Sequence, residues 1–261
     1  MADIKSKPIE LPSEGYFYPE GHPLSDGTIK IRHMTAADED ILTDEQLLQK
    51  GEAIDELLKN VIVEEGVDLD DVLNGDVGGI MLATRILAYG PQYRFETECP
   101  VCEEKNQKTA DLTEIQSKDV PFDEFERNQT EFSLSLPATG SSIVFSLLTR
   151  GEVKQVNTEL DRVKRNAGKQ TSKGKKAGRQ VSTNMTTRLR YLIDEVDGSR
   201  DVKDIRDFVQ QMPARDSLAL RNEVSRINPD LDLTYDFICD FCGHREDIDI
   251  PLDETFFFPG R

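Results

Sequence analysis

Four cysteines are the residues of this chain best suited to chemistry, and they occur as two Cys-x-x-Cys pairs. The pairs are Cys99/Cys102 and Cys239/Cys242, and the chain contains no other cysteine. Two residues between thiolates form a tight knuckle that offers both sulfurs to one ion, and two knuckles complete a tetrahedral zinc site. Such a closed shell leaves no open position for water or substrate, so the spacing predicts one structural Zn²⁺.

The two pairs are far apart in the sequence, because residues 103–238 lie between them. Compact zinc ribbons place roughly 15 to 20 residues between their knuckles. Loop closure costs only about 0.6 kcal/mol per doubling of loop length, so three doublings cost roughly 2 kcal/mol. Zinc binding in small fingers supplies roughly 10–16 kcal/mol, and a long-range site is therefore energetically feasible.

Disulfides, free thiols and a redox pair are the alternatives for these cysteines. A redox Cys-x-x-Cys stands beside a βαβ pattern and a helix start, and neither is visible here. Disulfides require an oxidising compartment, which no secretory signal indicates. His244, two residues past Cys242, is the one residue suited to replace a cysteine ligand, although we expect it to face solvent.

The composition indicates a globular protein with a strongly acidic surface. The chain has 261 residues, enough for one large or two small domains, and 50 acidic against 32 basic residues give a formal net charge of −18. Phosphate binding needs positive faces, so nucleic acid is an unfavoured partner and basic proteins are favoured. No apolar run approaches a membrane span, and the first residues match no signal or transit peptide. We therefore expect a soluble protein that is intracellular when made.

One segment departs from this acidic average. Eight basic and no acidic residues occur from Arg162 to Arg179, together with three glycines. The segment has no apolar periodicity, which is typical of a mobile loop and predicts one at about 162–184. Docking onto an acidic protein surface and contact with nucleic acid are the alternatives, but no aromatic residue is interleaved for base stacking.

The sequence also predicts an internal duplication. Thr28–Thr35 can be laid over Ser142–Thr149, and each is a short strand followed by a helix start with an acid three residues after a threonine. The offset is 114 residues there and 140 residues at the cysteines. An insertion of 26 residues centred on the basic segment explains the difference. Each half would then contribute one knuckle to one zinc, coincidental similarity being the alternative.

Further elements follow from apolar spacing and capping residues in both halves. Two of the expected helices begin at an aspartate that would act as the N-cap. The predicted elements are helices over Ile54–Ile62 and Val153–Val163, helices over Val77–Ala88 and Ser217–Ile227 capped by Asp76 and Asp216, and strands over Tyr93–Glu98 and Leu233–Ile238 leading into the knuckles.

Motifs of catalysis are missing from the sequence. The three histidines, His22, His33 and His244, have no acid–base partner at a useful spacing. There is no Gly-rich phosphate loop, no His-Glu-x-x-His helix and no nucleophile elbow. We therefore expect neither an enzyme nor a small-molecule substrate.

Aromatic residues are concentrated at both ends of the chain. Tyr16–Tyr18 lie in the proline-containing stretch Pro8–Pro19, and Phe256–Phe258 lie near the C-terminus. Exposed aromatic segments reduce solubility, so each end either folds onto the chain's own core or docks on a partner. Both alternatives are open from the sequence.

These motifs together resemble a known protein family. They are Leu-Pro-Ser-x-Gly-x-x-Tyr-Pro at Leu11–Pro19, the strand Ile29–Arg32, the helix start Thr35–Glu39 and the knuckle Cys99–Cys102. The combination resembles the baseplate hub and hub-assembly proteins of contractile-tailed, T-even-like bacteriophages, and the likeness is best up to Leu112. Glu103 departs from the Gly that often follows a ribbon knuckle.

The resemblance implies a non-enzymatic structural or assembly protein of the tail baseplate, either a hub component or a hub-assembly factor. Its partners would be other tail proteins, met in the host cytoplasm during assembly and in the virion. A zinc-ribbon adaptor in a transcription or nucleic-acid complex is the alternative function, although acidic residues such as Glu98 and Asp247 surround the knuckles.

The predicted fold is α+β and mainly helical, with two similar halves joined by a discontinuous four-cysteine zinc ribbon with short antiparallel strands. The aromatic ends and the basic loop would engage neighbouring tail proteins. The expected divisions are an extended N-terminal arm (1–27), a first half (28–112), a connector (113–141), a second half (142–251) and an aromatic C-terminal tail (252–261).

Overall fold

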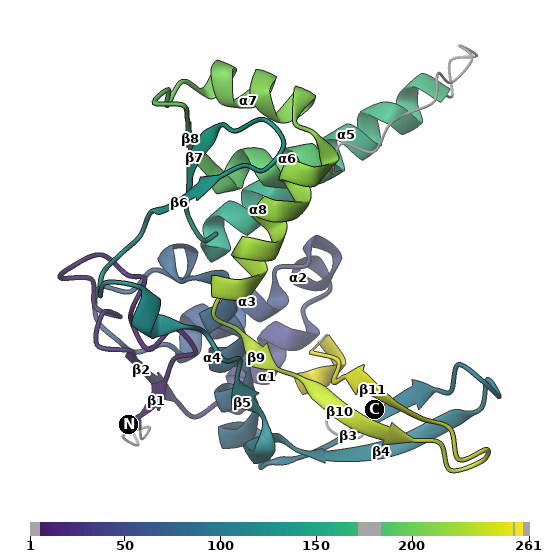
Figure 1. Cartoon of the computed structure of the whole chain (residues 1–261). Coiled ribbons are helices and arrows are strands. Elements are labelled where there is room, and N and C mark those ends of the chain that lie inside the picture. Colours follow the sequence, from purple (N-terminus) through teal and green to yellow (C-terminus); the bar gives the residue numbers. More distant parts are fainter. Residues whose placement is uncertain (1–5, 172–183, 253, 258–261) are drawn as a thin grey trace.

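The computed structural model describes residues 6–171, 184–252 and 254–257, which form a mixed α/β fold (Figure 1). Eight α-helices and several small antiparallel sheets occur in these described ranges. The helices are α1 (Ala36–Thr43), α2 (Glu45–Lys50), α3 (Ala53–Val61), α4 (Asn74–Tyr89), α5 (Arg150–Thr171), α6 (Asn184–Leu192), α7 (Val202–Gln211) and α8 (Ala214–Ile227).

The strands pair locally, and one pair joins distant parts of the chain. The sheets are β1-β2, β3-β4, β10-β11, β5-β9 and β6-β7-β8, and all pairings are antiparallel. The strands are β1 (Ser6–Glu10), β2 (Thr28–Arg32), β3 (Gln92–Glu98), β4 (Lys105–Asp111), β5 (Gln116–Ser117), β6 (Phe132–Ser135), β7 (Ser142–Phe145), β8 (Ile193–Val196), β9 (Leu231–Asp232), β10 (Thr234–Ile238) and β11 (Arg245–Asp249). The β5–β9 pair therefore joins the predicted connector to the predicted second half.

Both predicted helix starts, at Thr35 and Thr149, are confirmed, and each has the hydrogen bonds of a capping box. At the start of α1, the backbone N–H of Thr35 donates to the Asp38 carboxylate at 2.8 Å, and the Thr35 hydroxyl accepts from the backbone of Asp38. At the start of α5, the N–H of Thr149 donates to Glu152 Oε2 at 2.9 Å, and the N–H of Glu152 donates back to Thr149 Oγ1. These bonds satisfy N–H groups that have no partner within the helix.

The structure differs from the prediction at the basic segment. Helix α5 continues to Thr171, so the first part of the predicted loop, from residue 162, is helical. Lys, Arg and Ala permit a helix, and the glycines that suggested a loop lie mostly further on. The rest of the predicted loop, residues 172–183, lies outside the described residues.

The prediction that Asp76 and Asp216 act as N-caps is wrong. Helix α4 begins at Asn74 and α8 at Ala214, so each aspartate is the third residue of its helix. Instead of capping its own helix, each carboxylate accepts hydrogen bonds from a turn that is distant in the sequence. Acidic residues are favoured both at the cap and in the first turn, and local sequence does not separate the two positions.

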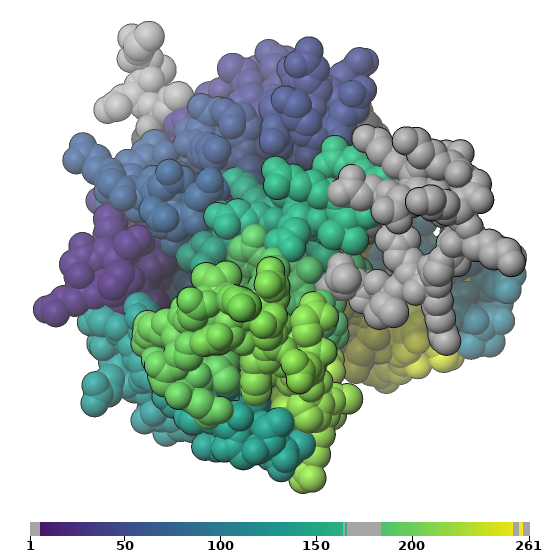
Figure 2. Space-filling view, turned by 90° about the horizontal axis from the view of Figure 1, so that it is seen from above, coloured from purple at the N-terminus to yellow at the C-terminus, as the bar shows by residue number. Residues whose placement is uncertain are grey.

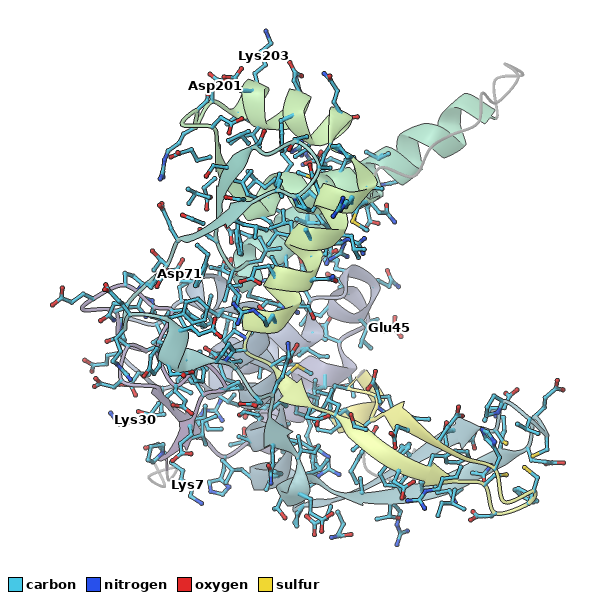
Figure 3. All side chains as sticks on the ribbon, in the orientation of Figure 1. Lys7, Lys30, Glu45, Asp71, Asp201 and Lys203 are labelled. Atoms are coloured by element: carbon cyan, nitrogen blue, oxygen red, sulfur yellow. The ribbon has the colours of Figure 1, made fainter. Side chains whose placement is uncertain are left out.

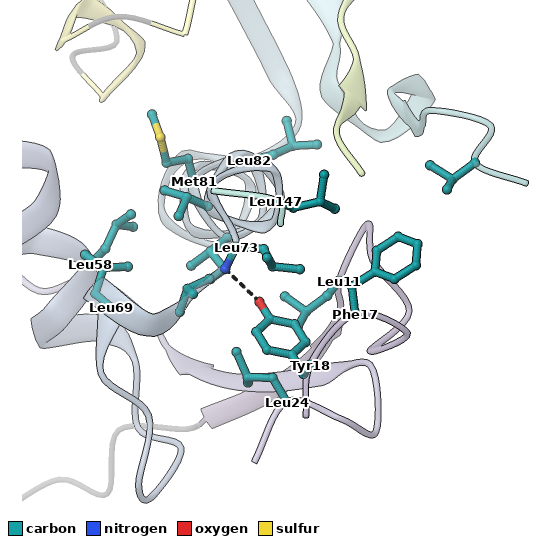
Figure 4. Close-up of a cluster of buried hydrophobic side chains, with 14 of the residues drawn as sticks. Leu11, Phe17, Tyr18, Leu24, Leu58, Leu69, Leu73, Met81, Leu82 and Leu147 are labelled. Atoms are coloured by element: carbon teal, nitrogen blue, oxygen red, sulfur yellow. Dashed lines mark hydrogen bonds between the residues drawn. The ribbon is translucent and has the colours of Figure 1, made fainter. Parts of the chain in front are cut away.

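The predicted N-terminal arm is part of the core from Leu11 onward. Phe17 packs against the rings of Phe125 and Phe132, with centroid distances of 5.6 and 5.2 Å. The hydroxyl of Tyr18 accepts a hydrogen bond from the N–H of Leu73 at 3.0 Å, as Figure 4 shows within the surrounding apolar cluster. Of the two alternatives for these aromatic residues, the structure shows folding onto the chain's own core.

The aromatic residues near the C-terminus are buried as well. Phe256 and Phe257 are fully buried, and Phe256 meets the ring of Tyr93 edge-on at 5.0 Å. The buried guanidinium of Arg85 donates from Nε to the Phe256 carbonyl at 2.8 Å and from Nη1 to Gly90 at 3.1 Å. The expectation that these aromatic residues engage neighbouring proteins is therefore wrong for Phe256 and Phe257, because they stabilise the chain itself.

One hydrophobic core runs through both predicted halves, and it includes Leu57 of α3 and Ile227 of α8. Asp55 of α3 strengthens the contact between the halves, since it pairs with Arg150 at 2.6 Å and Lys154 at 2.8 Å of α5. Seen from above, the surfaces of the two halves adjoin (Figure 2). Within the described ranges, no helix combines the length and apolar character needed to cross a bilayer.

Candidate metal centre

Two β-hairpins project together from the helical body and carry the four cysteines at their tips. The β3-β4 hairpin holds Cys99 and Cys102 in its turn, and the β10-β11 hairpin holds Cys239 and Cys242. Figure 1 shows the hairpins side by side, and Figure 3 shows sulfur atoms at their outer ends. The turns are thus brought together although they are distant in the sequence.

The two knuckles have the same backbone geometry. The N–H of Cys99 donates to the Glu104 carbonyl at 3.0 Å, and the N–H of Glu103 donates to the Cys99 carbonyl at 2.9 Å. In the second knuckle, the corresponding bonds join Cys239 to the His244 carbonyl at 2.8 Å and Gly243 to the Cys239 carbonyl at 3.0 Å. This pattern aims both thiols of each pair to the same side of the turn.

Glu103 adopts the backbone conformation that glycine adopts in the second knuckle. Its φ is 59°, and that of Gly243 is 73°. A non-glycine residue in this left-handed region costs roughly 1–2 kcal/mol. Glu103 therefore replaces the usual glycine at the cost of local backbone strain. The first knuckle keeps the same geometry as the second.

The four thiols form one compact cluster in which all sulfur atoms lie within 4.8 Å of one another. Cys99 Sγ lies 3.7 Å from Cys242 Sγ, and Cys102 Sγ lies 3.6 Å from Cys239 Sγ. A disulfide has a sulfur–sulfur distance of about 2.05 Å, so the four cysteines are free thiols in this structure. Zn–S bonds of about 2.3 Å in a tetrahedron place sulfurs about 3.8 Å apart, which these two distances match.

Asn106 of β4 links the two knuckles. Its side-chain N–H₂ donates to the Glu104 carbonyl at 2.8 Å and contacts Cys239 Sγ at 3.6 Å, and its carbonyl oxygen accepts from the N–H of Asp240 at 2.8 Å. Asn106 is 1% exposed, and its buried amide therefore connects the two hairpins. Such outer groups orient metal ligands in proteins.

The thiols differ strongly in acidity because they are crowded together. Burial raises the pKa of Cys239, but N–H groups of Cys242 and Phe241 and the neighbouring thiols outweigh it and bring the pKa to about 6. For Cys102, the N–H of Glu104 lowers the pKa, whereas burial and the other thiols raise it to about 12. One thiol thus ionises readily, and its negative charge disfavours ionisation of the next thiol. A bound divalent cation would favour the thiolate form of both.

The structure brings together all four cysteines that the sequence singled out. His244 is outside this set: its carbonyl completes the second knuckle, and its Nε2 lies 3.7 Å from Glu246. Sequence reasoning missed Asn106, because its partners lie on a hairpin more than 130 positions away. It also missed Lys108, whose ammonium pairs with Asp240 at 2.6 Å and lies 5.5 Å from the centre of the Phe237 ring.

Comparison with known protein families gives a match over most of the chain. A family model described as T4 bacteriophage base plate protein matches residues 9–258, nearly the whole chain and both cysteine-bearing hairpins. No curated protein and no solved structure matches the chain.

Proposed function

The chain belongs to the T4 bacteriophage base plate protein family, and we propose that it is a non-enzymatic component or assembly factor of the baseplate hub. The family match over residues 9–258 carries this proposal, since it includes the body of the molecule and the complete cysteine cluster. The protein would act by binding other tail proteins, first in the host cytoplasm and then in the virion.

We also propose that Cys99, Cys102, Cys239 and Cys242 hold one Zn²⁺. The set of four thiols, the sulfur–sulfur distances of 3.6 and 3.7 Å and the matched knuckles support zinc. Four thiolates around one zinc leave no ligand position open, so the ion would be structural. It would fix the β3-β4 hairpin against the β10-β11 hairpin.

An internal duplication is a further part of the proposal. Two turns with the same pattern, Leu11-Pro-Ser-Glu-Gly15 and Leu136-Pro-Ala-Thr-Gly140, each follow a strand and precede its antiparallel partner. Each turn is held by an aspartate at the third position of a helix, Asp76 in α4 and Asp216 in α8. These correspondences support two related halves, each of which supplies one knuckle.

Metal content and thermal unfolding test the zinc proposal. We expect one zinc per purified chain, and no zinc with a lower melting temperature in the double variant Cys99→Ser/Cys102→Ser. Glu98→Gln is the matched control, since this exposed side chain adjoins Cys99 but is no ligand. An unchanged melting temperature in the double variant would remove zinc from the mechanism.

Fractionation of phage assembly intermediates tests the role in the baseplate. The tagged chain should cosediment with baseplate intermediates, and its presence in mature particles would distinguish a hub component from an assembly factor. Recovery with polymerase subunits or nucleic acid, and not with tail proteins, would contradict the baseplate role and favour the adaptor.

A further inference from the structure

The outer end of the two hairpins exposes apolar side chains that the metal centre does not require. We call residues 98–105 and 238–246 the knuckle tip. Val101 is 65% exposed, Phe241 64% and Ile238 48%, and these are three of the seven large apolar residues exposed in the described part of the chain. Apolar exposure is therefore concentrated at a small part of the surface.

Val101 and Phe241 occupy the same position in their knuckles, directly before the second cysteine. A thiolate knuckle needs its two cysteines and a residue with positive φ after them, and Glu103 and Gly243 supply that conformation. The N–H of Phe241 donates to Cys239 Sγ at 3.4 Å, but any residue except proline would provide this donor. The metal centre thus accounts for the backbone conformation of the knuckles. It does not account for the apolar side chains at positions 101 and 241.

Position in the fold prevents the body of the protein from covering these side chains. The hairpins extend away from the helices, and their tips are surrounded by solvent in the described part of the chain (Figures 1 and 3). A solvent-facing phenylalanine and valine on a rigid turn are typical of residues that become buried in a partner.

Charge around the tip indicates which partner would fit. Five acidic and two basic side chains give the knuckle tip a formal charge of −3. Lys105 and Arg245 are paired with Glu96 and Asp236 on the adjoining strands, and Asp240 is paired with Lys108. Four thiolates with one Zn²⁺ would add a further −2. Two such tips would repel each other, and nucleic acid would be repelled as well. Only a surface with positive charge around an apolar depression complements this combination.

We propose that the knuckle tip is a docking element that inserts Val101 and Phe241 into an apolar pocket rimmed by Lys or Arg on a different protein of the tail. This inference rests on the proposed baseplate function. The metal would hold both side chains in a fixed arrangement, so that little conformational entropy is lost on binding. The acidic rim would orient the approach and make it sensitive to salt.

Substitution at the tip tests the proposal in a phage that lacks the native gene. Purified Val101→Ser/Phe241→Ser should keep its zinc and melting temperature, but its incorporation into baseplate intermediates should fall by roughly tenfold or more. The matched control is Leu218→Ser, which removes an apolar side chain 49% exposed on α8 and should incorporate like the wild type. Higher salt should weaken incorporation of the wild type.

A photo-crosslinking amino acid at position 241 identifies the occupant. The expected product joins this chain to a different tail protein, at a peptide whose surroundings contain Lys or Arg. Undiminished incorporation of the double variant, or crosslinking to a second copy of this chain, would overturn the docking proposal while leaving the baseplate function intact. If the wild type itself never associates with baseplate intermediates, the proposed function fails and the docking proposal falls with it.

Discussion

Two turns of the molecule with the same Leu-Pro-x-x-Gly pattern are each held by an aspartate, in different surroundings. In the first turn, the N–H of Ser13 donates to Asp76 at 2.8 Å. In the second turn, the N–H of Ala138, at the same place in the pattern, donates to Asp216 at 2.6 Å. The framework of helix, aspartate and turn is therefore shared.

The remaining hydrogen-bond donors differ between the two aspartates. Asp76 accepts two hydroxyl hydrogen bonds, from Ser13 Oγ at 2.7 Å and from the hydroxyl of Tyr18 at 2.7 Å. Asp216 accepts instead from the backbone N–H of Thr139 at 3.0 Å. Tyr18 belongs to the longer loop that follows the first turn, between Gly15 and β2, whereas Gly140 in the second turn is followed almost directly by β7. The extra loop places an aromatic residue over Asp76 and buries it among apolar side chains.

The surroundings set opposite acidities for the two carboxyl groups. Burial raises the pKa of Asp76 to about 6, although the hydrogen bonds from Tyr18 and Ser13 oppose the shift. Burial also disfavours the charge of Asp216, but the N–H groups of Ala138 and Thr139 outweigh it and lower that pKa. Both aspartates are fully buried, but the residues that donate to Asp76, Ser13 and Tyr18, are buried as well, whereas Ala138 and Thr139 at Asp216 are exposed.

The largest difference between the two aspartate sites should appear at the residue before each aspartate. A Cβ on Gly75 would lie 1.6 Å from the carbonyl oxygen of Pro229, whereas the corresponding Arg215 is exposed. Although alanine favours a helix by about 1 kcal/mol over glycine, we expect Gly75→Ala to destabilise the protein by about 3 kcal/mol. Arg215→Ala should change stability by less than about 0.5 kcal/mol. Urea unfolding measures both, and a Gly75→Ala variant as stable as the wild type would contradict the close packing.

Removal of each carboxylate should show how much Asp76 and Asp216 each contribute to stability. Asp76→Ala leaves the buried N–H of Ser13 and the hydroxyl of Tyr18 without their acceptor, and we expect a loss of about 2–3 kcal/mol at neutral pH. Asp216→Ala should cost about 1 kcal/mol, because its backbone donors are partly accessible to water. Equal losses in denaturant unfolding would show that the two sites are energetically alike.

Titration of Asp76 should make the free energy of unfolding depend on pH. Its pKa is about 6 in the folded protein and near 3.8 in the unfolded chain, so the unfolded state ionises first as the pH rises. Stability should therefore fall with rising pH through this window and level off above about 6. Relative to Asp76→Asn, the wild type should lose about 2 kcal/mol between pH 4.5 and 7.5. A difference between the two proteins that does not vary with pH would mean that Asp76 titrates normally.

The smallest expected effect concerns the two knuckles. Glu103→Gly should stabilise the metal-loaded protein by about 1 kcal/mol, because glycine adopts the φ of 59° without strain. Gly243→Ala should destabilise it by a similar amount. Glu103→Gln is the control for charge, since it keeps the strained Cβ. A Glu103→Gly variant that melts no higher than Glu103→Gln would argue against strain in the first knuckle.

The sequence was sufficient to predict features whose determinants are local. The two capping boxes at Thr35 and Thr149 depend on residues three positions apart, and both are present. The four cysteines were predicted to meet, because each knuckle is a local motif and two are needed for a closed site. Family membership also followed from short motifs, and the family model bears it out.

Features that depend on distant partners could not be predicted in the same way. Asp76 and Asp216 have sequences typical of helix starts, but their hydrogen-bond partners lie 63 and 78 positions away. Arg85 is buried against the carbonyl of Phe256, 171 positions away, and nothing around it in the sequence indicates burial. The paired Leu-Pro-x-x-Gly turns were visible in the sequence, but their offset of 125 residues matches neither 114 nor 140 and was missed.

The separation of the two knuckles also has a consequence for synthesis of the protein. Cys102 and Cys239 lie 137 positions apart, so at about 5–20 residues per second roughly 7–27 s pass between their translation. During that interval the first hairpin has two thiols and no partner hairpin. We expect that a chain terminated prematurely before the second pair cannot close the centre, and the metal would thereby mark polypeptides whose translation reached the last hairpin.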